Sequence, residues 1–350
     1  MVSILEAALV GMLAPINAPA GWYRTIDRVE ADVTLAFAHG GPQGPDDALL
    51  DFSVNTNPLG PNPDLVRIWR ESPVDRYPDP HYTRTREALA GWHGWDPDGV
   101  VLGVGASELL HRIVRAFVRP GSTVYALGAP FGEFARGVAL QGGTLRVLPR
   151  QTPLGALPAT EDDLLYLSNP HNPTGHWLDP HGLAAWPGML VMDEAYLPFV
   201  ESPIELPMRD RLIRVCSPGK AHGVLGMRLA YALTTPRIAQ RLRAFQPAWA
   251  IPTPLAAVLE ALPAHQDFVA RTVPVARAWA RDLAGALGAV WSGLHFFVVA
   301  VDDASNIAKC LCEKYIRVRD CTSFGYPNLI RVATRLPEEN ARLIAAWHSI

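Results

Sequence analysis

The sequence contains few cysteines, and their spacing gives them no structural task. The 350 residues include four, at Cys216, Cys310, Cys312 and Cys321. This spacing fits neither a zinc site nor a disulfide framework. Four cysteines in a chain of this length suit a reducing compartment, so we expect no metal and no disulfides, and we expect a cytoplasmic location.

The chain also lacks a long apolar run and an excess of positive charge. Ile4–Pro15 is apolar, but it contains Glu6, lacks a preceding basic region and is too short to cross a bilayer. The formal net charge is -3, whereas a nucleic-acid-binding surface needs concentrated basic charge. We therefore expect no signal peptide, no membrane segment and no nucleic-acid partner.

Lysine is the rarest of the charged side chains. Of the 31 basic residues only three are lysines, Lys220, Lys309 and Lys314. The chain uses arginine for its ordinary surface charge, so a lysine inside a motif stands out. Arginine cannot replace lysine in a Schiff base, because its guanidinium group stays protonated in proteins.

What the chain does contain is ample material for a core. Apolar residues make up 49% and charged residues 19% of the sequence, which is typical of globular proteins. A chain of this length exceeds the usual size of one hydrophobic core, which predicts two domains. We expect an N-terminal arm over residues 1–50 that packs with the small domain, a large domain over 51–250 and a small domain over 251–350.

The large domain is expected to be α/β. Helices are predicted from Ser107 and over Gly132–Leu140, where apolar residues recur at helical spacing. Strands alternating with helices indicate a mostly parallel sheet between helical layers. The strands are predicted at Val100–Gly103, Thr123–Leu127, Leu145–Leu148, Leu164–Ser168, Met189–Met192, Leu212–Cys216 and Leu229–Leu233.

The pattern after Pro252 predicts a smaller α+β domain. A largely helical stretch covers about Pro254–Leu287, and we expect Pro263 and Pro274 to divide it. Further elements are predicted as strands at Phe296–Val301 and Leu329–Ala333, and as helices around Asn306–Lys314 and from Pro337.

Polar clusters follow four of the predicted strands of the large domain. They are Gly103–Ser107, Ser168–Gly175, Asp193–Tyr196 and Ser217–Lys220. Each alone is explained by turn or cap chemistry. In parallel sheets, however, ligands bind beyond the carboxyl ends of the strands, which is where all four lie.

Together the clusters meet the needs of pyridoxal 5'-phosphate (PLP). Its aldehyde needs a lysine, and Lys220 is the one lysine in this half of the chain. Its pyridine nitrogen must stay protonated to act as an electron sink, which Asp193 would ensure. Donors to the ring oxygen are Asn172 and Tyr196. The phosphate would be bound by helix N-terminal amides at Gly105, Ala106 and Ser107, by the Ser217 hydroxyl and by Arg228.

These motifs resemble the class I/II aminotransferase family of fold type I PLP enzymes. The resemblance rests on Asn172-Pro173-Thr174-Gly175, Asp193-Glu194-Ala195-Tyr196, Ser217-x-x-Lys220 and Gly226-x-Arg228-x-x-Tyr231, and it covers roughly residues 36–350. It implies that Lys220, Asp193 and Tyr196 are catalytic. It further implies that Arg331 binds the substrate carboxylate, that Phe131 stacks on the cofactor ring, and that Tyr77 reaches the PLP phosphate of a neighbouring subunit, which requires a homodimer.

Flanking residues most resemble threonine-phosphate decarboxylases of cobalamin biosynthesis. The cues are His39-Gly40-Gly41, then Asp51–Gly60, and Arg319-Asp320-Cys321 near the C-terminus. Histidinol-phosphate aminotransferases of amino acid biosynthesis share the core motifs and are the alternative. The substrate is expected to be a small amino acid or amine carrying a phosphate, bound by Asn57, Arg331 and Arg335, although Arg335 would equally suit ordinary surface charge.

A catalytically degenerate PLP-binding regulator is a third alternative. Such regulators carry a DNA-binding module ahead of this fold, and the first 35 residues are too short and too poor in basic residues for one. One departure from the family pattern is Gly219, where Ser or Thr is usual before the lysine.

Overall fold

A computed structural model describes residues 40–44, 49–204, 206 and 209–350. Residues 1–39 of the expected N-terminal arm, including the apolar segment Ile4–Pro15 and His39, lie outside the described residues. In the described part of the chain, no helix is both long and apolar enough to cross a membrane.

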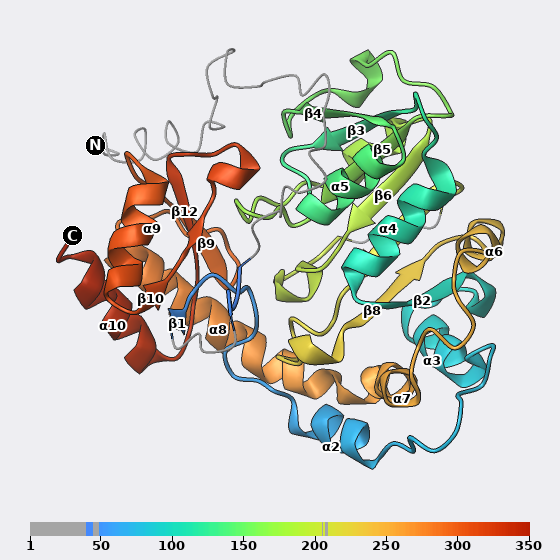
Figure 1. Ribbon diagram of the computed structural model, residues 1–350, viewed down its shortest axis with the longest axis horizontal. Coiled ribbons are helices and arrows are strands. Elements are labelled where there is room, and N and C mark those ends of the chain that lie inside the picture. Colours follow the sequence, from blue (N-terminus) through green and yellow to red (C-terminus); the bar gives the residue numbers. More distant parts are fainter. Residues whose placement is uncertain (1–39, 45–48, 205, 207–208) are drawn as a thin grey trace, which may run out of the picture.

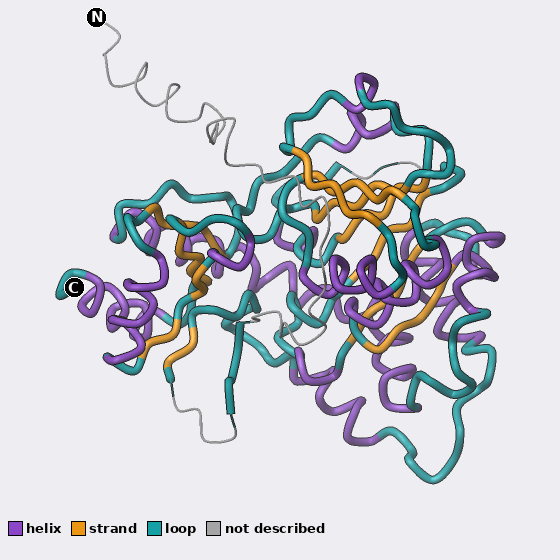
Figure 2. Tube along the Cα trace, turned by 45° about the horizontal axis from the view of Figure 1, so that its top comes forward, coloured by secondary structure: helices purple, strands orange, loops and turns teal. Residues whose placement is uncertain are grey.

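The larger lobe is built on a seven-stranded sheet (Figures 1 and 2). Its strand order is β2-β8-β7-β6-β5-β3-β4, and β8 runs antiparallel to both of its neighbours while the other pairs are parallel. The expected mostly parallel sheet is therefore confirmed. The strands are β2 (Val100–Val104), β3 (Thr123–Leu127), β4 (Thr144–Leu148), β5 (Leu164–Ser168), β6 (Met189–Asp193), β7 (Leu212–Cys216) and β8 (Leu229–Leu233).

Helices cover both faces of this sheet, because alternate strand residues are apolar on each side. One face packs on α4 (Ala106–Phe117), α5 (Gly132–Leu140) and α6 (Pro236–Arg243). The other packs on α2 (Pro63–Glu71), α3 (Thr83–His93) and α7 (Thr253–Ala261) around β2 and β8. Near β5 and β6 this second face is covered by a short helical segment, Pro180–Ala185.

The smaller lobe holds a three-stranded antiparallel sheet with the order β11-β12-β9. The chain just after the N-terminal region joins this lobe, because β1 (Leu50–Asp51) pairs in parallel with β10 (Ile316–Arg317). The remaining elements are β9 (Phe296–Ala300), β11 (Arg319–Asp320), β12 (Leu329–Ala333), α8 (Gln266–Ala286), α9 (Ala304–Glu313) and α10 (Pro337–Trp347).

The structure contains one of the two proline breaks expected in the C-terminal half and lacks the other. Pro263 does end α7, but the expected break at Pro274 is wrong, because α8 continues through it. Val273 and Ala276 on either side are buried, and this packing keeps the helix continuous despite the lost backbone donor. The domain boundaries at residues 50/51 and 250/251 stay predictions; α7, expected with the small domain, packs on α2 and α3.

Candidate active site

The polar clusters meet at one edge of the large sheet. The strands that run parallel all end at this edge, and β8, which runs the opposite way, begins there. Gly105 follows β2, the 169–176 loop follows β5, and Lys220 lies beyond β7. Arg228 immediately precedes β8, and its neighbour Leu229 pairs with Val104. The single antiparallel strand therefore brings Arg228 to the same edge as Gly105.

Lys220 lies in a tight turn after β7, with its backbone carbonyl accepting from Asn57 (2.9 Å). Its Nζ lies 5.3 Å from the centroid of the Tyr196 ring. Within the described residues, the ammonium group of Lys220 makes no hydrogen bond or ion pair. A half-buried amine held against an aromatic face is suited to react with a carbonyl.

Asp193 is a buried carboxylate at the end of β6. Its Oδ1 accepts from the Ala195 backbone N–H (3.1 Å) and its Oδ2 from the Tyr166 hydroxyl (3.1 Å). Burial raises the pKa of Asp193, although the charge of Lys220 and these two donors oppose the rise. A pyridinium nitrogen facing this carboxylate would supply the counter-charge that burial demands.

The N-terminus of α4 and Arg228 form an anion-binding corner. Gly105 is the residue before α4 and has φ +82°. A Cβ at Gly105 would lie 2.4 Å from Nη2 of Arg228, so glycine is required both for its backbone angle and for this close approach. The first-turn amides of Ala106 and Ser107 and an adjacent guanidinium are the donors that a phosphate group needs. The residues present therefore fit the phosphate end of PLP.

Arg331 reaches from the small sheet to the same site. One Nη donates to Oδ1 of Asn172 and the other to the backbone carbonyl of Ser53. Its side chain also lies over the Phe296 ring at 5.9 Å. Burial lowers the pKa of Arg331. Among the described residues no carboxylate forms an ion pair with Arg331, so an incoming carboxylate would supply the charge that balances it.

Arg319 lies directly opposite Arg331 on the adjacent antiparallel strand. Directly opposed side chains share a face of the sheet, with Cβ atoms about 5 Å apart. The Arg319 Nη2 donates to the Ser323 hydroxyl (2.7 Å), and the guanidinium lies over Phe324. Burial, and next the charge of Arg331, lower the pKa of Arg319. Arg319 lies in a motif of the sequence but was assigned no role, because only the strand register shows that it lies opposite Arg331.

Three of the expected site residues have other partners in this chain. The Asn57 amide donates to the carbonyl of Ala221 (2.8 Å) and to Thr272 (2.7 Å), so it braces the Lys220 turn. Arg335 donates to Glu339 (2.9 Å) and to the carbonyl of Asp51 (3.2 Å). Tyr77 is 75% exposed and stacks on Trp249 of its own chain.

Two residues that the sequence did not single out, Tyr166 and Asn55, contact Asp193 and Tyr196. Phe131 caps α5, and its backbone hydrogen-bonds the Tyr166 hydroxyl. Asn55 donates to the Tyr196 hydroxyl (3.3 Å). Tyr166 and Asn55 were missed from the sequence, because a tyrosine inside an apolar strand looks like core. Ser217 immediately follows β7, beside the Lys220 turn, where its hydroxyl was expected to meet a phosphate.

Comparisons of the sequence with known proteins agree on one family. Residues 47–346 match the sequence pattern of the class I and II aminotransferases. The chain is 30% identical to a histidinol-phosphate aminotransferase of Roseiflexus castenholzii, covering 97% of this chain and 98% of that protein. It is 29% identical to a provisionally named threonine-phosphate decarboxylase of Caldanaerobacter subterraneus, covering 85% and 89% of the two chains.

A solved structure supports the same grouping. The histidinol-phosphate aminotransferase of Sinorhizobium meliloti, solved with PLP, superposes with a TM-score of 0.73 at 25% identity. The superposition covers 85% of this chain and 90% of that structure. The fold type I architecture expected from the motifs is thereby confirmed, with its larger, mostly parallel sheet and its smaller α+β lobe.

Proposed function

The chain belongs to the class I and II aminotransferases and is a PLP-dependent enzyme, and from this premise we propose that it acts at the Cα of a small phosphorylated amino acid or amine. Bound PLP supplies an electron sink for negative charge at Cα. The observation that carries the proposal is the convergence of Lys220, Asp193 and Arg331 on one edge of the large sheet. These residues come from both lobes, so the site lies between them.

The cofactor would be held at both ends by residues of this edge. Lys220 would form the covalent link, and Asp193 would face the ring nitrogen. Tyr196 and Asn172 would donate to the ring oxygen, and Phe131 would stack on the ring. The phosphate would bind to the amides of Gly105, Ala106 and Ser107, to Ser217 and to Arg228.

The substrate's charges would bind to the two buried arginines of the small sheet. Arg331 suits an α-carboxylate, because a guanidinium can donate to both carboxylate oxygens. Arg319, on the same face of the sheet, suits a second anion such as a phosphate. The sequence alone suggested Arg335 for this second role. Arg335 pairs with Glu339 on its own side of the small lobe, whereas Arg319 is directly opposite Arg331 in the sheet, so we favour Arg319 on its position beside Arg331.

The reaction best supported is decarboxylation of an O-phosphorylated amino acid, as in threonine-phosphate decarboxylases. Two neighbouring guanidinium groups match a substrate with a carboxylate and a phosphate. The alternative is amino transfer from histidinol phosphate, favoured by the name of the Roseiflexus relative. The two reactions differ in which Cα bond stands perpendicular to the ring, which depends on how Arg331 and Arg319 orient the substrate.

One experiment separates the two reactions. The purified protein, loaded with PLP, is incubated with O-phosphothreonine and assayed for carbon dioxide. In parallel it is incubated with histidinol phosphate and 2-oxoglutarate and assayed for glutamate. Carbon dioxide release without glutamate formation is the expected result. Glutamate formation alone would establish the alternative. If the protein formed neither carbon dioxide nor glutamate, the proposed substrate class would be contradicted.

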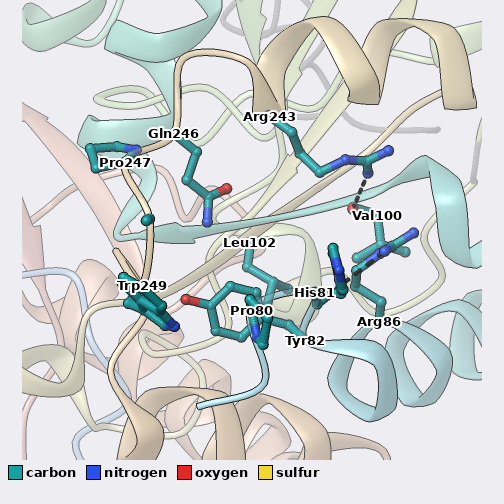
Figure 3. Close-up of a pocket in the computed structure, with 11 residues that line it drawn as sticks. Pro80, His81, Tyr82, Arg86, Val100, Leu102, Arg243, Gln246, Pro247 and Trp249 are labelled. Carbon is teal, nitrogen blue, oxygen red and sulfur yellow. Dashed lines mark hydrogen bonds between the residues drawn. The ribbon is translucent and has the colours of Figure 1, made fainter. Parts of the chain in front are cut away.

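We also infer that the working unit is a homodimer. Tyr77 and Val74 are 75% and 86% exposed, and Tyr77 stacks on Trp249 with centroids 4.6 Å apart. Trp249 and Tyr82 line an open pocket of about 240 Å³ on this face (Figure 3). The Tyr82 hydroxyl bonds both the N–H and the C=O of Ile251 at 3.2 Å, which holds the segment in place. A fixed, exposed aromatic surface suits contact with a second copy.

A further inference from the structure

Arg150 is a buried cation that none of the roles above uses. It follows β4 and is 8% exposed. In the described part of the chain it forms no ion pair with any carboxylate. Burial lowers its pKa to about 10, so the guanidinium remains charged at neutral pH. A buried charge without a counter-ion is costly, and it persists only where dipoles solvate it well.

The dipoles that solvate Arg150 come from three separate segments. Its Nη1 donates to the carbonyls of Leu127 (3.3 Å) and Ser168 (3.1 Å), at the ends of β3 and β5. Its Nη2 donates to Oδ1 of Asn169 (3.3 Å) and to the carbonyl of His176 (3.3 Å). One planar guanidinium therefore joins both ends of the 169–176 loop to the sheet edge, which a lysine's ammonium could not match in geometry.

The loop held in this way is also closed on itself. The His171 N–H donates to the His176 carbonyl (3.0 Å), and the Gly175 N–H to the His171 carbonyl (2.7 Å). The His171 ring packs beside Arg150, since a Cβ at Gly128 would meet both side chains. Burial, and next the charge of Arg150, lower the pKa of His171, which favours the neutral ring. In that form Nε2–H donates to the Ala129 carbonyl (3.2 Å) and Nδ1 accepts from the Thr174 hydroxyl (2.8 Å).

Asn172 lies within this loop, and its Oδ1 accepts a hydrogen bond from Arg331. Within the described residues the side chain of Asn172 hydrogen-bonds Arg331 of the small sheet and no group of the large sheet, so its position relative to the large sheet depends on the loop. We propose that Arg150 is a positioning residue that fixes Asn172 relative to Lys220 and Arg331. The inference rests on the proposed function of this site, in which Asn172 donates to the cofactor's ring oxygen.

The test is a double-mutant cycle between Arg150 and Asn172 in the PLP-loaded enzyme. The variants are Arg150→Lys, Arg150→Met, Asn172→Ala and Arg150→Lys/Asn172→Ala. Arg146→Lys and Arg146→Met are the matched controls, because Arg146 is an exposed arginine on β4. Three quantities are measured: the PLP dissociation constant, the pH at which the visible absorption band changes, and kcat/KM. Circular dichroism reports folding.

Arg150→Lys should shift the pH transition of the band in the same direction as Asn172→Ala and should lower kcat/KM on the order of 10- to 100-fold. In the Asn172→Ala background it should have little further effect, because residues that act as one unit are not additive. The Arg146 variants should match the wild type in all three measurements.

Three outcomes would overturn the proposal. The first is a folded Arg150→Lys protein with wild-type PLP affinity and spectrum. The second is that the fold-losses in kcat/KM of the two single variants multiply in the double variant, as they do for residues that act independently. The third is that neither Arg150 variant folds, which would make Arg150 a residue of stability alone. If the wild type turned over no phosphorylated substrate, the proposed function would fail, but the PLP and spectral measurements would still decide on Arg150.

Discussion

Arg319 and Arg331 stand directly opposite each other on β11 and β12, with 8% and 4% of their surfaces exposed. Two like charges so placed repel each other, and an anion bound beside them offsets the repulsion. The pKa of each guanidinium is lowered, chiefly by burial. We propose that this pair selects substrates that carry two anionic groups.

The first prediction separates the roles of the two arginines. Arg331→Ala should weaken transition-state binding of threonine and of O-phosphothreonine alike, by about 2–5 kcal/mol, because each loses its partner for the carboxylate. Arg319→Ala should weaken only the phosphorylated substrate. Values of kcat/KM for both substrates check this. Arg335→Ala is the control, since Glu339 pairs with Arg335; loss of the phosphate preference in that variant alone would move the second anion site to Arg335.

The second prediction concerns the covalent link. Borohydride reduction of the PLP-loaded protein should fix the cofactor on Lys220, because its amine is half-buried against Tyr196 and has no other partner in the described residues. Peptide mass spectrometry locates the adduct. Lys220→Ala should keep the fold and lose the adduct, whereas Lys309→Ala should retain it. An adduct confined to Lys309 or Lys314 would refute the assignment.

The third prediction uses the raised pKa of Asp193. Without cofactor, the buried ionised carboxylate destabilises the folded state. This cost begins as the pH rises above the ordinary carboxyl value of 3.8 and is complete above the folded-state pKa. Below that window the carboxyl is neutral in both states, so the cost is absent. Apo Asp193→Asn should therefore melt at or above the wild-type Tm at neutral pH, and this difference should shrink as the pH falls through the window.

The opposite sign is expected once PLP is bound. Asp193 then has a cationic partner, so PLP should raise the Tm of the wild type more than that of Asp193→Asn. Turnover by the Asn variant should fall by orders of magnitude. Scanning calorimetry with and without PLP gives both comparisons. Near-full activity in the Asn variant would reduce Asp193 to a strand-end cap.

The fourth prediction tests whether Tyr77 serves the partner's site. Lys220→Ala and Tyr77→Ala proteins, each of low activity, are mixed at equal amounts and allowed to exchange subunits. Half of the dimers become mixed, and each of these has one intact site out of two, so the mixture should recover about a quarter of wild-type activity. Sedimentation confirms the dimer. No recovery despite subunit exchange would mean that Tyr77 acts in its own chain or not at all.

The sequence predicted the large sheet well, because its buried strands are short apolar runs bounded by turns. It did not predict α2 and α3, which are less apolar and pack against α7 through few buried residues, such as Leu65 and Leu89. The expected break at Pro274 was wrong because tertiary packing overrode a local preference.

The motifs predicted which side chains lie together at the sheet edge, whereas relationships that depend on strand register were missed. The motifs around Lys220 and Asp193 could be read directly. The opposition of Arg319 and Arg331 follows only from the pairing of β11 with β12. Arg150 was missed because one arginine after a strand carries no signal until its four acceptors are seen together.

The distribution of lysines over the two lobes has a practical consequence. Lys309 lies on α9 and Lys314 immediately follows it, and both are exposed, whereas Lys220 is half-buried. Amine-directed coupling to a solid support, done with PLP protecting Lys220, would attach the described part of the chain through one end of the small lobe (Figure 1). Immobilised molecules would then share one orientation, with the large sheet directed away from the support.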